Sequence, residues 1–213
     1  MGRIKNGIVK ALETARNERE IQPYLKKNLL IVCNTLNYWA WNYTEVIPEF
    51  QLGNEYRADF LILSADSGSW HAVFVELKSH RARQFTKAGI PTKSLSLALR
   101  QLDDWERWLD KNDNAFRLSL SRHFEKKRVA AQCSTADSHI RAAEEIIDPR
   151  TPITKHYKVL LGRRSMLSKE ENERRAAFLR KNHEILTYDR LLDTATKIDI
   201  ANMELKHTKA KGV

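Results

Sequence analysis

Two short apolar segments carry charged residues where a buried strand would normally carry none. Residues 58–63 read ADFLIL, and residues 71–78 read HAVFVELK. Side chains alternate along a strand, so both segments place apolar groups on both faces, as in a sheet that is covered on each side. A carboxylate on such a strand is costly unless it is paired or binds a metal ion. We therefore expect a covered sheet with Asp59, Glu76 and Lys78 meeting near the strand ends.

The rest of the chain shows two kinds of hydrophobic pattern. Apolar residues that recur every three or four positions indicate helices, whereas short apolar runs bounded by Gly, Pro or Asn indicate strands. We expect helices at residues 4–16, 94–111, 137–147, 168–182 and 188–196. We expect strands within 44–63 around a Gly53–Asn54 turn, then at 71–78, 157–161 and 184–187. This order predicts an α/β or α+β fold with a mixed β-sheet flanked by helices.

Three segments carry weaker signals. The helical pattern at 21–29 contains Pro23, which is tolerated only in the first turn of a helix. We therefore expect this helix to restart near Gln22 or to bend there. Residues 111–156 are polar and have little periodicity outside the helix given above. The Lys-rich residues 203–213 are expected to form a frayed tail.

The charge of the chain suggests a polyanionic partner. Lys and Arg total 37 against 27 Asp and Glu, which gives a net charge of +10. Nucleic acid is the commonest partner of so basic a protein, and a surface kept basic for solubility is the alternative. No apolar run approaches the roughly 18 residues of a membrane span, and no secretory leader is visible. With only two cysteines and no CxxC pair, we expect a cytoplasmic protein without structural zinc.

The charged strand residues suggest a metal site as well as local pairing. Asp59, Glu76 and Lys78 would bring together two carboxylates and one ammonium group. This suits Mg²⁺, which binds few carboxylates and keeps water for a phosphate substrate. The alternative is a simple salt bridge from Lys78, and for the tripeptide alone that alternative is preferred. Glu20 on the preceding helix and Gln101 on the following helix extend the set and favour the metal site.

This constellation resembles the PD-(D/E)xK nuclease superfamily, and more closely the nuclease domain of Shedu anti-phage defence proteins. Two departures are Ala58, where the superfamily usually has Pro, and Ser79–His80 after the ExK. The resembling pieces occur in order and cover most of residues 17–192. They are NEREIQPYLKKN (17–28), IPEFQLGNEYRADFLIL (47–63), FVELK (74–78), ALRQLDDWERWL (98–109), KVLLGRR (158–164) and ILTYDRLL (185–192).

The resemblance implies a restriction-endonuclease-like core and a metal-dependent DNA endonuclease that hydrolyses phosphodiester bonds in anti-phage defence. Asp59, Glu76 and the backbone carbonyl of Leu77 would bind Mg²⁺, for which Mn²⁺ can substitute. Lys78 would orient the attacking water or stabilise charge on the phosphate. Gln101 would point at the lysine or the water. Glu20 would complete the metal site; its alternative role is a helix cap with the preceding Asn17.

Four arginines are the candidates for binding DNA phosphates. Arg81 and Arg83 follow the ExK strand, and Arg163 and Arg164 follow the strand expected at 157–161. The resemblance also implies a homo-oligomer, and Trp105 with Trp108 on one helix suits either a core or a subunit interface. Larger Shedu proteins carry a sensing region, so an unidentified sensor or regulatory partner is expected.

We expect three parts in the chain: an N-terminal helix at 1–16, the nuclease domain at 17–196 and a basic C-terminal tail at 197–213. Two functional alternatives stay open at this point. One is a non-catalytic nucleic-acid-binding module on a nuclease scaffold. The other is a restriction or repair nuclease of the same superfamily, which would share the same residues. A protein-interaction domain whose ELK is only a salt bridge is a weaker third.

Overall fold

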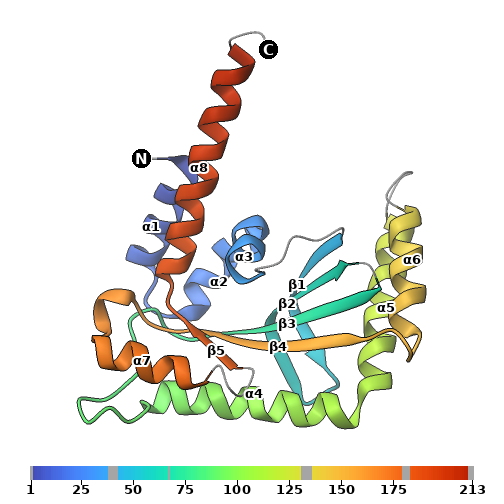
Figure 1. The fold of residues 1–213 in the computed structure, drawn as a ribbon, viewed down its shortest axis with the longest axis horizontal. Coiled ribbons are helices and arrows are strands. Elements are labelled where there is room, and N and C mark those ends of the chain that lie inside the picture. Colours follow the sequence, from blue (N-terminus) through green and yellow to red (C-terminus); the bar gives the residue numbers. More distant parts are fainter. Residues whose placement is uncertain (1, 38–42, 67, 131–135, 179–182, 211–213) are drawn as a thin grey trace. The chain divides into compact units, whose positions relative to one another are not determined.

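The computed structural model describes residues 2–37, 43–66, 68–130, 136–178 and 183–210 (Figure 1). The last predicted residues of the 168–182 helix, 179–182, and the last three residues of the tail lie outside this description. The helices are α1 (Arg3–Thr14), α2 (Glu18–Lys27), α3 (Leu29–Leu36), α4 (Lys93–Lys111), α5 (Asp113–Ala130), α6 (Ala136–Ile147), α7 (Lys169–Ala177) and α8 (Asp189–Ala210), with a 3₁₀ turn η1 (Arg164–Met166). The strands are β1 (Tyr43–Leu52), β2 (Tyr56–Asp66), β3 (Ser69–Leu77), β4 (Ile153–Leu160) and β5 (His183–Leu186).

The strands form one mixed sheet in the order β1-β2-β3-β4-β5. β1 and β2 pair antiparallel, whereas β4 and β5 pair parallel. The predicted fold class, a mixed sheet with helices, is therefore confirmed. Among the described residues, no helix combines the length and the apolar character needed to cross a lipid bilayer.

The chain divides into two compact units. The first contains residues 1–39, 75–99 and 157–213, and the second contains residues 40–74 and 100–156. In the first unit α8 packs against α1 and α3, and Ile8, Leu12, Leu36 and Leu191 are all buried. α7 begins at the predicted capping box. The Ser168 hydroxyl accepts the backbone N–H of Glu171, and the Glu171 carboxylate accepts the backbone N–H of Ser168.

The second unit has an aromatic core. The ring of Phe116 lies 5.9 Å from Phe50 and 5.7 Å from Phe74, and Phe74 lies 6.5 Å from Trp105. Trp105 is fully buried, so it packs in the core. The turn between β1 and β2 passes close to the half-buried Trp108, because a Cβ at Gly53 would lie 2.9 Å from its ring. That glycine also has a φ of +61°, which side chains disfavour.

Some elements of the structure differ from the prediction in extent, and others were not predicted. α2 runs from Glu18 to Lys27 with Pro23 inside it, so the predicted restart near Gln22 is wrong. The helix begins early because the Asn17 side chain caps it, accepting the N–H groups of Arg19 and Glu20. α5 was not predicted at all, and α8 continues to Ala210, well past the predicted end at 196.

Candidate active site

The charged pair at the end of β3 is the centre of the candidate site. β3 is buried from Ala72 to its end, and Glu76 is only 5% exposed. The Lys78 ammonium donates to the Glu76 carboxylate at 2.6 Å, because residues two apart on an extended chain share a face. The Lys78 N–H also donates to the Leu160 carbonyl at 2.8 Å, which fixes the strand end to β4. This contact is the salt bridge that was expected as the alternative to a metal site. A metal site at this strand end would contain the same Glu76 carboxylate and Lys78 ammonium.

Asp59 lies on β2 in the second unit, between two fully buried neighbours. Its own side chain is half-buried, and it lies between the strand pairs Pro48–Phe60 and Phe50–Ala58, in the interval where β1 contains Glu49. Glu49 has a φ of +52°, the only positive φ outside glycine among the described residues. A left-handed non-glycine residue costs about 1–3 kcal/mol and persists only where the surroundings fix it. Sequence analysis did not single out Glu49. The signal that could have done so is the preceding Pro48, because a proline within a strand marks an edge or a bulge.

The remaining predicted members of the site are divided between the units. Gln101 is half-buried on α4 in the second unit, whereas Leu77, with Glu76 and Lys78, belongs to the first. The structure thus brings Glu76 and Lys78 together directly. The approach of Asp59 and Gln101 to this pair stays a prediction.

Glu20 makes the contacts of a helix cap. It is exposed in the first turn of α2, where its carboxylate accepts the Arg16 N–H at 2.9 Å. Its other oxygen lies 3.4 Å from the side-chain amide of Asn17, the residue that caps the helix. The cap predicted as its alternative role is therefore present in a closely related form, and its metal role stays a prediction.

The loop after β3 is fastened to the end of β4. The Ser79 carbonyl accepts the Gly162 N–H at 3.1 Å, and the buried Gln84 amide donates to the Leu161 carbonyl at 2.8 Å. Gly162 has a φ of +70°, and a Cβ there would lie 2.5 Å from the Ala82 carbonyl oxygen. The glycine in the KVLLGRR segment is therefore required by the close approach of this loop.

The two arginines of this loop make different contacts. Arg81 donates to the ring of His80 at 3.3 Å and to the Glu13 carbonyl at 3.1 Å. Burial, and then the nearby Arg81 charge, lowers the pKa of His80, which favours the neutral ring as the acceptor for Arg81. Arg83 is also exposed and pairs with Glu171 at 3.3 Å. Both arginines keep part of their surface accessible, as a phosphate contact requires.

Arg163 and Arg164 are held by the start of α8. Arg163 pairs with Asp189 at 3.2 Å, and Arg164 pairs with Asp193 at 2.5 Å. Burial alone would raise the pKa of Asp189, but the Arg164 N–H and the Arg163 guanidinium hold it below the ordinary value. These arginines are thus positioned by carboxylates, and their binding to DNA stays a prediction.

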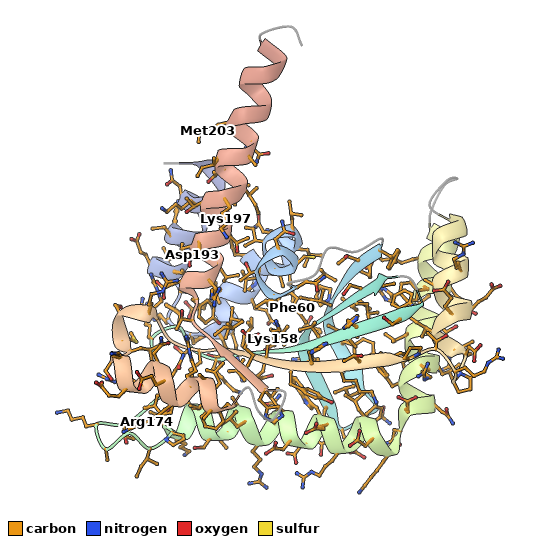
Figure 2. The ribbon with its side chains drawn as sticks, in the orientation of Figure 1. Phe60, Lys158, Arg174, Asp193, Lys197 and Met203 are labelled. Carbon is orange, nitrogen blue, oxygen red and sulfur yellow. The ribbon has the colours of Figure 1, made fainter. Side chains whose placement is uncertain are left out.

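A buried charge pair that sequence analysis missed lies in the same unit. Lys158 on β4 is directly opposite Glu184 on β5, and their charged groups lie 2.9 Å apart. Figure 2 labels Lys158 on its strand, where it is 3% exposed. Burial lowers the pKa of this lysine. Nothing local in the KVLL segment predicts the pair, because it depends on the register of two strands far apart in sequence.

The chain matches one known protein family. The sequence model of the C-terminal region of the Shedu protein SduA matches residues 15–192. That range contains Glu76 and Lys78, Asp59 and Gln101, and all four candidate arginines. Among curated proteins, none matches the chain. Since the matched range covers most of the sequence, the chain belongs to the family of Shedu SduA C-terminal domains.

Proposed function

We propose that this chain is a divalent-metal-dependent DNA endonuclease that hydrolyses phosphodiester bonds in anti-phage defence. The observation that carries the proposal is the nearly buried Glu76 carboxylate, 2.6 Å from the Lys78 ammonium at a strand end of a Shedu-family domain. Burying a carboxylate and an ammonium together is costly, and replacing such pairs by apolar residues is often stabilising. A catalytic use explains why this pair stands on an otherwise apolar strand.

The donor atoms of the proposed site fit a hard cation. Carboxylates of Glu76 and Asp59 and the backbone carbonyl of Leu77 are oxygen donors, which Mg²⁺ or Mn²⁺ prefers. Bound Mg²⁺ would supply Lewis-acid polarisation of the phosphate and a lower pKa for a coordinated water. The Lys78 ammonium would balance the negative charge that develops on the phosphate oxygens. The Gln101 amide would orient the attacking water through hydrogen bonds.

Affinity for DNA would come from the basic surface. The net charge of +10 favours a polyanion, and Arg81, Arg83, Arg163 and Arg164 keep guanidinium groups near the loops that follow β3 and β4. We also propose a homo-oligomer and a separate sensor or regulatory partner, as the resemblance to larger Shedu proteins implies. Sedimentation velocity at micromolar concentration tests the first of these, and a monomer would contradict it.

The test is a cleavage assay on linear and supercoiled DNA with Mg²⁺ or with EDTA. The variants are Asp59→Asn, Glu76→Gln and Lys78→Ala, and the matched control is Glu173→Gln, which changes an exposed carboxylate on α7. We expect wild type and the control to cut only with metal. Each site variant should lose about 10²-fold or more, since removal of one electrostatic group commonly costs that much.

The assay separates this proposal from its alternatives. DNA binding without cleavage by wild type, under every metal condition, would favour the non-catalytic binding module. Equal cleavage by wild type and Lys78→Ala would place the chemistry elsewhere. Cleavage restricted to one base sequence would favour a restriction-type enzyme.

A further inference from the structure

A polar pocket in the first unit carries an unusual density of positive charge. It has a volume of about 340 Å³ and lies where η1, α7, the end of β5 and the start of α8 come together. Its charged lining residues are Arg164, Lys169, Arg175, Arg190 and Asp193. Four of these side chains are cationic and one is anionic, so the pocket is strongly suited to a negatively charged ligand.

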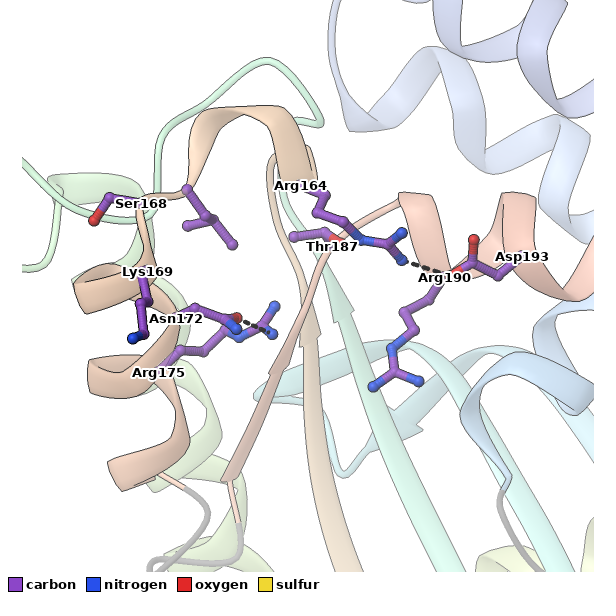
Figure 3. Close-up of a pocket in the computed structure, with 9 residues that line it drawn as sticks. Arg164, Ser168, Lys169, Asn172, Arg175, Thr187, Arg190 and Asp193 are labelled. Carbon is purple, nitrogen blue, oxygen red and sulfur yellow. Dashed lines mark hydrogen bonds and ion pairs between the residues drawn. The ribbon is translucent and has the colours of Figure 1, made fainter.

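Two of the cationic groups are held in place by neighbours. The Arg164 guanidinium pairs with Asp193 at 2.5 Å, and the Arg175 guanidinium donates to the Asn172 side chain at 2.6 Å. Figure 3 shows both contacts, with Arg175 on the α7 side of the pocket and Arg164 and Arg190 on the other side. Guanidinium groups fixed in this way lose little freedom when they bind a phosphate, and their planar donors match its oxygens.

The lining also limits what the ligand can be. Among the described residues, no aromatic side chain lines the pocket and Leu167 is the one aliphatic residue that does, so these residues offer no surface on which a base could stack. The Thr187 hydroxyl and the Asn172 amide add further hydrogen-bond donors, whereas the Ser168 hydroxyl already donates to Glu170 at 2.7 Å. The volume is near the lower end of the about 300–1,000 Å³ typical of small-molecule sites, which leaves room for more than one phosphate group.

We propose that this pocket binds a diphosphate-containing anion, either inorganic or as the phosphate chain of a nucleotide. The ligand would bridge α7 and α8, with Arg175 and Lys169 on one helix and Arg190 on the other. This site is additional to the proposed nuclease centre, and the proposal does not depend on DNA cleavage.

The test is calorimetric titration of the full chain with pyrophosphate, triphosphate and ATP at about 0.15 M ionic strength, where weak long-range attraction is screened. Arg175→Ala and Arg190→Ala should each weaken pyrophosphate binding by about tenfold or more, as loss of a charged hydrogen bond predicts. The matched control is Arg174→Ala on the same helix. Arg174 is exposed, is labelled in Figure 2, and lies against Gly89 rather than in the pocket. The Arg174→Ala variant should bind pyrophosphate with the affinity of wild type.

Several outcomes decide the matter. Equal affinity for triphosphate and ATP would mean that the phosphate chain alone is recognised, and tighter binding of ATP would add a contact to the nucleoside. Both support the proposal. Absence of binding to all three anions would overturn it, as would an equal loss in Arg174→Ala and Arg175→Ala. Displacement of pyrophosphate by duplex DNA, with DNA affinity lost in Arg175→Ala and Arg190→Ala, would also overturn it, because these arginines would then bind the DNA backbone. Unchanged circular dichroism and melting temperature of the unliganded variants would exclude misfolding as the cause.

Discussion

Asp199, in the middle of α8, accepts the backbone N–H of Ile4 at 3.1 Å with one oxygen of its carboxylate. Its other oxygen accepts the N–H of Lys5 at 2.9 Å. The first turn of α1 therefore receives its cap from a residue almost 200 positions away, while the local cap residue, Gly2, has no side chain to offer. α1 and α8 lie side by side in Figure 1, and this buried carboxylate is one reason.

Replacing this cap should loosen α1. Asp199→Ala is expected to lower the free energy of unfolding by about 1–2 kcal/mol, because two N–H groups of α1 lose their acceptor and the positive helix end loses a negative charge. Urea unfolding measures the change, with the exposed Lys197→Ala on the same helix as control. If both variants unfold at the same urea concentration, the cap contributes nothing.

The Glu76–Lys78 pair gives a metal test that does not depend on cleavage. Without metal, Lys78→Ala should lower stability by about 1–3 kcal/mol, since a buried carboxylate loses its ammonium partner. Mn²⁺ should raise the melting temperature of wild type and recover much of the loss in Lys78→Ala, because a ligand that binds only the folded state stabilises it. Glu76→Gln should respond little to Mn²⁺.

The control for this experiment is Lys87→Ala, which removes an exposed lysine from the loop before α4. It should behave like wild type with and without metal. A Glu76→Gln protein that gains as much stability from Mn²⁺ as wild type would show that the ion binds elsewhere.

Local sequence patterns were sufficient to predict the elements that are determined by interactions between residues close in sequence. α4 has apolar residues at regular helical spacing, the β1–β2 turn has Gly53, and α7 has its capping box. The Glu76–Lys78 contact was also predictable, because two residues on one strand face are adjacent whatever surrounds them. Contacts set by strand register, such as Lys158 with Glu184, are not encoded in either segment alone.

α5 escaped prediction for a related reason. Its buried residues, Phe116, Leu120 and Phe124, are mixed with basic ones, and Arg117 is itself buried. In sequence Arg117 resembles an exposed surface charge. Asp113 is its one local partner, and the three carbonyl acceptors that explain its burial lie about 30 positions away, where no local pattern can reveal them.

Arg117 should be a major contributor to the stability of the second unit. Its guanidinium donates to the carbonyls of Ile146, Asp148 and Thr151 at 2.9–3.0 Å, so it satisfies the end of α6 and the turn that follows. Arg117→Ala should lower the free energy of unfolding by about 3 kcal/mol, since several buried acceptors lose their donor at once. Arg117→Lys should recover only part of this free energy, because an ammonium group cannot reproduce the planar set of donors of a guanidinium group.

The control is Arg122→Ala, which removes an exposed arginine from the same helix. Urea unfolding compares the three variants with wild type. A similar small effect for Arg117→Ala and Arg122→Ala would contradict the role given to the buried guanidinium.

Asp113 should make the same unit sensitive to acid. Burial alone would raise the pKa of Asp113, but hydrogen bonds from Arg117 at 2.6 Å and Lys155 at 3.0 Å hold it below its ordinary value of 3.8. Because the folded pKa is the lower one, the stabilisation is fully present above the unfolded pKa and is lost as the pH falls through the folded pKa. Urea unfolding from about pH 5 down to about pH 2 should therefore show a smaller acid loss for Asp113→Asn than for wild type. The exposed Asp110→Asn should follow wild type, and an identical acid loss in Asp113→Asn would show that the carboxyl group does not contribute.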